Sequence, residues 1–166
     1  MDIIDGGVTS AKGFAAAYTA AGIKYKTGRN DMAMLYSSLP CRSAGTFTTN
    51  VVKAAPVKWD KRVVEEGGDV HAVVINAGIA NACTGEEGLR YCKETGEAAE
   101  RLLSVPAENV LVASTGVIGM QLPMDRICAG VAAMVPLLKE GREAGHAAAK
   151  AIMTTDTKEK EAAVTI

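Results

Sequence analysis

Histidine is scarce in this sequence, and the cysteines are not spaced as metal ligands. Only His71 and His146 are present, and none of the four cysteines forms a C-x-x-C pair with another. Neither a zinc site built from cysteine and histidine nor a convincing Ser–His–Asp triad is therefore expected, and we predict no bound metal. Without a secretory signal, the cysteines are expected to be reduced and packed as small apolar groups.

Excess charge of one sign and long hydrophobic runs are also absent. The chain has 18 Lys and Arg against 19 Asp and Glu, with no basic cluster interleaved with aromatic residues, so no nucleic-acid partner is expected. The longest apolar runs fall far short of the roughly 18 residues that span a bilayer. The acidic N-terminus lacks the charged-then-apolar order of a signal peptide. These absences favour a cytoplasmic protein with no membrane partner.

What is present is the composition of one globular domain. With 166 residues, 48% hydrophobic and 22% charged, the chain can bury about two thirds of its unfolded surface. We therefore predict a single domain over residues 1–166. Short apolar runs and turn signals indicate an α/β fold, in which two strand–loop–helix units follow a β-rich opening.

The first half contains short strands and one short helix. The expected strands cover residues 32–36, 45–49 and 71–76. Pro56 occupies a favoured first helical position, and Gly67 is expected to close the helix that it opens. Small residues at 77–82 predict a loop after the last of these strands.

The second half is more helical. Thr84 and Glu87 have the form of a capping box, and apolar residues then follow a helical period, so a helix is predicted over 84–103. A strand is expected at 109–113. Further helices are expected from Pro123 and over the alanine-rich residues 146–153. Residues 162–166 resemble the start of a strand, which indicates either a fragment or processed subunit, or a frayed terminus.

Residues 113–119, ASTGVIG, form the most informative segment, because they follow the apolar run 110–112. We expect a sharp bend at which two successive backbone N–H groups point at one spot, with Gly116 allowing close approach and the Thr115 hydroxyl adding a third donor. Such a bend could stabilise an oxyanion, hold a phosphate, carry a nucleophile, or be a plain turn. The G-x-S-x-G and P-loop motifs are absent.

Other polar residues also lie at predicted element ends. Asn76 and Asn81 could orient a substrate carboxylate or amide, or could cap turns and the following helix. Residues 153–157, MTTDT, could bind a polar ligand or form a solvated helix end. Residues 48–50 are read as an ordinary strand end.

Several segments together resemble the α-chain of the bifunctional ornithine acetyltransferase/N-acetylglutamate synthase family of arginine biosynthesis. Each segment is weak alone, but the ordered set is specific. The segments are GGVT at 6–9, KGF at 12–14, AAGIK at 20–24, GTFTTN at 45–50, KAAPV at 53–57, INAG at 75–78, ANACTG at 80–85, STGVIG at 114–119, PM at 123–124 and IMTTDT at 152–157.

The resemblance implies an enzyme that is cleaved before a threonine, which becomes the N-terminal nucleophile of a separate β-chain. That threonine would take acetyl from N-acetylornithine, and in some members from acetyl-CoA, and pass it to glutamate. Its freed amino group would act as the general base. The implied fold is an N-terminal-nucleophile-like sandwich of sheet and flanking helices, completed by the β-chain in an α2β2 assembly, with no bound cofactor.

The resemblance also implies roles for three residues of this chain. Thr115 and Gly116 match the oxyanion-hole pair, and Thr154 matches a substrate-contacting threonine next to Thr155. The family's Lys-Gly-x-Gly-Met segment and its Met-Ala-Thr end are not present, so the nucleophile and a substrate-binding lysine are expected elsewhere. Ile79 also stands where many members carry a polar or small residue.

Two other functions remain open from the sequence. One is a related N-terminal-nucleophile amidohydrolase or aminopeptidase, which would give the acyl group to water. The other is a non-catalytic fragment that uses Thr115 and Gly116 to bind an anion.

Overall fold

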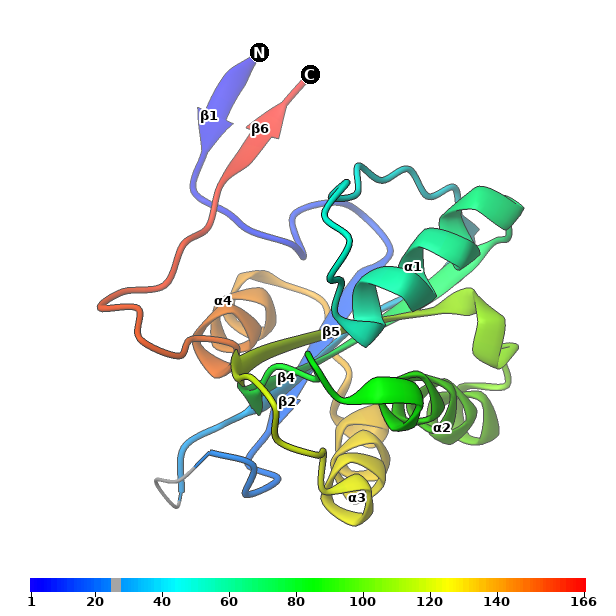
Figure 1. Cartoon of the computed structure of the whole chain (residues 1–166). Coiled ribbons are helices and arrows are strands. Elements are labelled where there is room, and N and C mark those ends of the chain that lie inside the picture. Colours follow the sequence, from blue (N-terminus) through cyan, green and yellow to red (C-terminus); the bar gives the residue numbers. More distant parts are fainter. Residues whose placement is uncertain (25–27) are drawn as a thin grey trace.

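Residues 1–24 and 28–166 are described by the computed structural model of this chain, and they form a four-stranded sheet, four α-helices and a separate two-stranded ribbon (Figure 1). In chain order the elements are β1 (Asp2–Ile4), β2 (Phe14–Thr19), β3 (Met32–Cys41), α1 (Ala55–Glu66), β4 (Val70–Ile79), α2 (Gly85–Leu103), the short helix η1 (Ala107–Asn109), β5 (Val110–Val117), α3 (Met124–Met134), the short helix η2 (Val135–Leu137), α4 (Arg142–Ala151) and β6 (Ala163–Thr165). None of these helices combines the length and apolar composition that crossing a membrane requires.

The sheet has the order β2-β3-β4-β5 and mixes two kinds of pairing. β2–β3 and β3–β4 are antiparallel, whereas β4 and β5 are parallel. Parallel neighbours need a crossover connection, and α2 provides it. β1 and β6 pair outside this sheet, which brings the two ends of the chain side by side (Figure 1). The predicted α/β class with flanking helices is confirmed.

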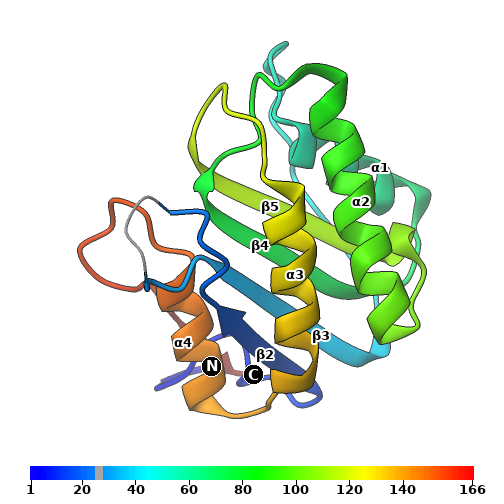
Figure 2. The same cartoon turned by 90° about the horizontal axis from the view of Figure 1, so that it is seen from below.

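Helices pack on both faces of the sheet. α2 and α3 lie across one face, as Figure 2 shows, and α4 packs on the other. Successive strand residues point to opposite faces. Met32 and Met34 of β3 therefore join the core under α2 and α3, whereas Ala33 packs against Ala148 and Ala151 of α4.

Two side-chain hydrogen bonds hold helix α1 against the outer edge of β5. Pro56 stands in its first turn, and Gly67 ends it with a φ of 69°, as the sequence predicted. The Trp59 indole N–H donates to the Val110 carbonyl at 2.9 Å, and the Asp60 carboxylate accepts the Val112 N–H at 2.9 Å. These two bonds use the Val110 carbonyl and the Val112 N–H on the outer edge of the first half of β5.

The strand expected at 45–49 is wrong, because these residues form no regular element. Thr48 Oγ1 accepts the Asn50 N–H at 3.2 Å, and Asn50 Oδ1 accepts the Val52 N–H at 3.0 Å. Such local side-chain bonds compete with sheet pairing and favour turns.

The capping box is also wrong, although the helix that it predicted is present. Thr84 makes no capping bond, because its hydroxyl donates to Asn81 Oδ1 at 2.8 Å. Helix α4 begins at Arg142 rather than at residue 146, after Gly141 with a φ of 98°. The strand expected near the C-terminus is present as β6.

The Asp60 carboxyl gives the fold a pH-dependent stability. Burial raises its pKa to about 6, although the bond from the Val112 N–H opposes the rise. Folding therefore favours the protonated form, so the contribution of Asp60 to stability is fullest below its ordinary pKa of 3.8 and is lost as the pH rises through about 6.

Asp60→Asn keeps an acceptor for the Val112 N–H and removes the charge. We expect it to raise the free energy of unfolding at pH 8 by about 1 kcal/mol, less than the full shift because the carboxyl is partly solvated. At pH 4 the gain should vanish. Denaturant unfolding at both pH values tests this, with Asp69→Asn, an exposed residue beyond the helix, as the control. An equal effect of Asp60→Asn at both pH values would contradict it.

Candidate functional site

Ser114, Thr115 and Gly116 lie inside β5 rather than at a bend. Their strand continues to Val117 and pairs residue for residue with the end of β4, so that Thr115 faces Ala77 and Gly116 faces Gly78. The expected bend after residue 113 is therefore wrong, and the loop expected over residues 77–82 begins only at residue 80, after β4 ends at Ile79. Parallel pairing extends both strands past the glycines at which the sequence indicated a break.

The pairing also decides where the backbone N–H groups point. In a parallel pair, alternate residues of one strand direct their N–H and C=O groups to the neighbour, and the residues between direct theirs outward. The Ala80 N–H donates to the Val117 carbonyl at 2.9 Å, whereas the Val112 N–H donates outward to Asp60. By this alternation the Thr115 N–H lies in the ladder with β4, and the Gly116 N–H lies on the outer edge.

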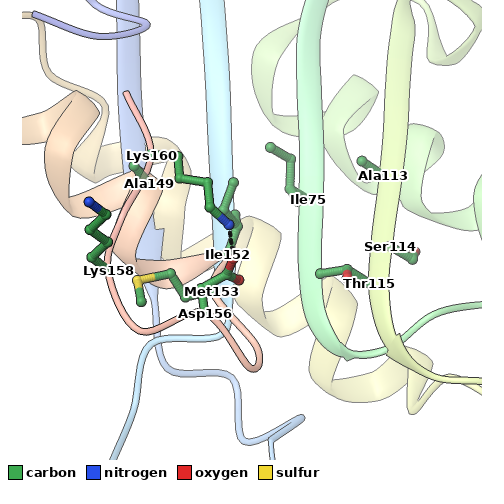
Figure 3. A pocket seen from close by; sticks show the side chains of 10 residues that line it. All are labelled: Ile75, Ala113, Ser114, Thr115, Ala149, Ile152, Met153, Asp156, Lys158 and Lys160. Carbon is green, nitrogen blue, oxygen red and sulfur yellow. Dashed lines mark hydrogen bonds and ion pairs between the residues drawn. The ribbon is translucent and has the colours of Figure 1, made fainter. Parts of the chain in front are cut away.

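The N–H groups of Thr115 and Gly116 therefore do not point at one spot, contrary to the prediction from the sequence. A different pair of donors is present. Gly116 offers its N–H beyond the part of the strand edge that α1 occupies, and Thr115 offers its side-chain hydroxyl. Figure 3 shows the Thr115 and Ser114 side chains extending to opposite sides of β5. An amide and a neighbouring hydroxyl remain a suitable pair for a negatively charged oxygen.

Ser114 is committed to an internal network. Its hydroxyl donates to Asn76 Oδ1 at 2.6 Å, and Asn76 Nδ2 donates to the Ile79 carbonyl at 2.9 Å. Asn81 is likewise internal, donating to the Gly88 carbonyl at 3.0 Å. Both asparagines are buried, so they hold turns and strand ends rather than facing a ligand.

Two glycines allow the strand ends to approach each other closely. Gly78 and Gly116 have φ values of 125° and 134°, which non-glycine residues rarely adopt. A Cβ on Gly116 would lie 2.2 Å from the Gly78 carbonyl carbon, and one on Gly78 would lie 3.2 Å from the backbone of Ile23. Side chains at these positions would therefore force the strands and the neighbouring loop apart.

One cavity of about 560 Å³ brings the predicted site residues together. Thr115, Gly116 and Thr154 all line it, although Thr154 is 38 positions from Gly116 and follows α4. The other described residues that line it are Lys24, Arg29, Gly78, Val117 and Thr155. Thr154 and Thr155 both line the cavity and are both exposed. Their positions therefore do not show which of the two would contact a substrate.

A second cavity, of about 380 Å³, adjoins the same strand end and shares Thr115 (Figure 3). Its other wall is the end of α4, with Ala149, and the segment that follows, including Met153 and Asp156. Asp156 accepts the Thr154 N–H at 3.3 Å and pairs with Lys160. The bond from Lys160, followed by that from Thr154, lowers the pKa of the Asp156 carboxyl. This carboxylate therefore orders the turn that carries Thr154.

Sequence reasoning missed the residues that build the opposite strand-end loop. Asp31 is 1% exposed, and its carboxylate accepts the N–H groups of Ala21, Ile23 and Lys24 at 2.7, 2.6 and 3.0 Å. Its carbonyl accepts the Ala77 N–H at 2.8 Å, which ties this loop to β4. In the sequence the only hint is an aspartate within the turn-forming residues 28–31, and this pattern does not reveal which amides the carboxylate binds.

Neither cavity is lined by a histidine or a cysteine within residues 1–24 and 28–166. His71 contacts the Ser37 carbonyl, and His146, in the middle of α4, contacts Glu161. Burial, and then the charge of Asp60, raise the pKa of the Cys92 thiol to about 12, which makes it a poor nucleophile. No cluster of potential metal ligands is present in the described part of the chain. The described lining of the cavity therefore offers donors to an anion, without a histidine or cysteine to act as base or nucleophile.

Comparisons with known proteins agree with this arrangement. The model of the ArgJ family matches residues 15–166. An arginine biosynthesis bifunctional protein ArgJ from Symbiobacterium thermophilum is 49% identical over 98% of this chain, and one from Streptomyces coelicolor is 49% identical over 95%. In both cases the chain spans 40% of the length of the relative.

Solved structures show the same fold. Ornithine acetyltransferase from Mycobacterium tuberculosis, complexed with ornithine, superposes with a TM-score of 0.89 at 45% identity, covering 94% of this chain and 83% of that one. ArgJ from Bacillus halodurans gives a TM-score of 0.84 at 38% identity, covering 97% of this chain and 84% of that one. The sequence segments, the strand-end site and these similarities agree, and the chain belongs to the ArgJ family.

Proposed function

We propose that this chain is the α portion of an acetyltransferase of arginine biosynthesis, which moves acetyl from N-acetylornithine to glutamate. The observation that carries the proposal is the shared cavity of Thr115, Gly116 and Thr154. Support also comes from the curated relatives, which are named for arginine biosynthesis, and from the solved relative complexed with ornithine.

The proposed role of Thr115 and Gly116 is to stabilise the tetrahedral oxyanion. A threonine hydroxyl on a second chain attacks the acetyl carbonyl of N-acetylornithine, and its proton passes through the threonine's free amino group to the departing ornithine nitrogen. The carbon–nitrogen bond breaks, leaving an acetyl ester on the threonine. The amine of glutamate then attacks this ester, and N-acetylglutamate departs as the threonine hydroxyl is restored. Both tetrahedral intermediates place negative charge on the oxygen that the two donors bind.

Thr154 is proposed to contact the substrate. Its side chain has no hydrogen bond in the described chain, and the turn that carries it is ordered by Asp156. A fixed backbone and an uncommitted hydroxyl suit a group that positions a polar substrate beside the reacting carbonyl.

The nucleophile is proposed to lie on a β-chain produced by self-cleavage of one precursor, with two α- and two β-chains assembling and the β-chain completing an N-terminal-nucleophile-like fold. Coverage supports this division, because the chain covers 83–84% of the matched solved chains but only 40% of the curated relatives. Those solved chains are thus much shorter than a whole relative. We propose acetyl-CoA as a second acetyl donor, in keeping with the relatives' name, which calls them bifunctional. No permanently bound cofactor is proposed.

Thr115→Val removes the hydroxyl with little change in volume. Loss of one oxyanion donor is expected to lower kcat for acetyl transfer by about 100- to 1000-fold while the melting temperature stays nearly unchanged. The assay is N-acetylglutamate formation by the full-length protein, with Thr157→Val, outside both cavities, as the control. An unchanged rate would contradict the oxyanion role, and release of free acetate in place of N-acetylglutamate would instead indicate a hydrolase.

Gly116→Ala tests whether the close strand approach is needed. Its Cβ would lie 2.2 Å from the Gly78 carbonyl carbon, so we expect the strand ends to separate and both activity and stability to fall. Gly119→Ala is the matched control, because Gly119 also has positive φ, at 82°, but nothing lies within 4 Å of the added Cβ. Gly119→Ala should cost about 1 kcal/mol and retain activity. Equal losses of activity in both variants would show that only backbone strain matters.

Intact mass measurement of the purified full-length protein tests the proposed division. We expect two polypeptides, the second of which begins with threonine. A single uncut polypeptide that transfers acetyl at full rate would contradict the proposed nucleophile.

A further inference from the structure

The cavity beside Thr115 and Gly116 is positively charged. Lys24 and Arg29 both line it, and the remaining described lining residues are glycine, valine and threonine. No described lining residue carries a carboxylate. Two like charges in one cavity repel each other, so an anionic ligand would stabilise this arrangement.

Lys24 is held in place rather than mobile. Its ammonium donates to the Asn30 carbonyl at 2.9 Å and to the Ala151 carbonyl at 2.8 Å, at the C-terminal end of α4. Its backbone N–H is fixed by the buried Asp31 carboxylate. An ammonium has three N–H donors, so these two bonds leave one for a ligand.

Among residues 1–24 and 28–166, no ion pair cancels the positive charge of Lys24. Its two acceptors are neutral carbonyls, and the Asp31 oxygens are occupied by backbone amides. Burial and the nearby Arg29 guanidinium lower the pKa of Lys24, while Asp31 opposes this change. Lys24 and Arg29 are therefore close enough for the charge of one to act on the other.

Of the two cationic side chains that line the cavity, that of Arg29 is the more exposed. It lies outside the ion pairs found over residues 1–24 and 28–166, which involve other arginines such as Arg90 and Arg142. Its guanidinium can present two parallel N–H groups to a carboxylate, a geometry that an ammonium cannot offer.

We propose that Lys24 and Arg29 form a carboxylate-binding subsite for the acetyl acceptor, and that this subsite favours a dicarboxylic amino acid. The inference rests on the proposed function, because it takes glutamate as the acceptor. Glutamate carries one net negative charge, whereas N-acetylornithine is a zwitterion whose side-chain ammonium would be repelled by two cations. The subsite therefore distinguishes the acceptor from the donor.

Arg29→Gln is the decisive variant, because Arg29 makes no bond in the described chain whose loss would disturb the fold. We expect the KM for glutamate to rise about 3- to 5-fold, as for a partly exposed ion pair, with the KM for N-acetylornithine within twofold of its original value. Lys24→Met should raise the KM for glutamate by about 10- to 100-fold, because it removes a charged hydrogen bond from a less exposed position. Added salt should raise the KM for glutamate in the original protein and do so less in Arg29→Gln.

Lys150→Gln is the matched control, because Lys150 is exposed on α4 and lines neither cavity. It removes the same charge from nearby surface and should leave both KM values unchanged. An unchanged KM for glutamate in Arg29→Gln, or equal rises for glutamate and N-acetylornithine, would overturn the subsite.

The outcome can be separated from that of the proposed function. If the full-length protein transfers acetyl but Arg29→Gln behaves like the original, the subsite is wrong and the function stands. If no acetyl transfer occurs, the function is wrong, and calorimetric binding of glutarate then tests the subsite directly. Glutarate should bind the original protein more tightly than Arg29→Gln, and equal affinities would overturn the subsite.

Discussion

The parallel pairing of β4 with β5 through Gly78 and Gly116 is the constraint on which the candidate site depends. It places the Thr115 N–H in the ladder and leaves the Gly116 N–H on the outer edge. It also puts the Thr115 side chain on the sheet face opposite the Ser114–Asn76 network. A donor pair made of one amide and one hydroxyl follows from strand geometry, without a special bend.

Buried side-chain bonds hold the surrounding segments around this strand end. The Asp31 carboxylate accepts hydrogen bonds from three backbone N–H groups of the loop that carries Lys24. The Lys24 ammonium in turn donates to the Ala151 carbonyl at the end of α4. The turn that carries Thr154 follows directly. Segments far apart in the sequence therefore meet at one cavity because single polar groups bridge them, and satisfied bonds of this kind make the arrangement more rigid.

The sequence was sufficient for elements whose signals are local. Pro56 and Gly67 marked both ends of α1, and the helical period predicted α2. Sequence patterns failed where the hydrogen-bond partner of a side chain decides the local structure. Thr84 bonds Asn81 instead of capping its helix, and Thr48 accepts the Asn50 N–H in a local turn instead of lying in a strand. The predicted residues Thr115, Gly116 and Thr154 do meet at one cavity, but the direction of the Gly116 amide depends on the register with β4. Lys24 and Arg29 could not be found, because their shared cavity forms only when the chain is folded.

The central claim is that Thr115 and Gly116 bind the oxygen that becomes charged during acetyl transfer. The most direct measurement is a crystal structure of the full-length protein with a tetrahedral phosphonamidate analogue of N-acetylornithine. The account predicts an anionic analogue oxygen about 2.7–3.1 Å from both the Gly116 nitrogen and Thr115 Oγ1. An analogue whose charged oxygen is bound by other groups, with Thr115 and Gly116 beyond hydrogen-bond distance, would contradict it.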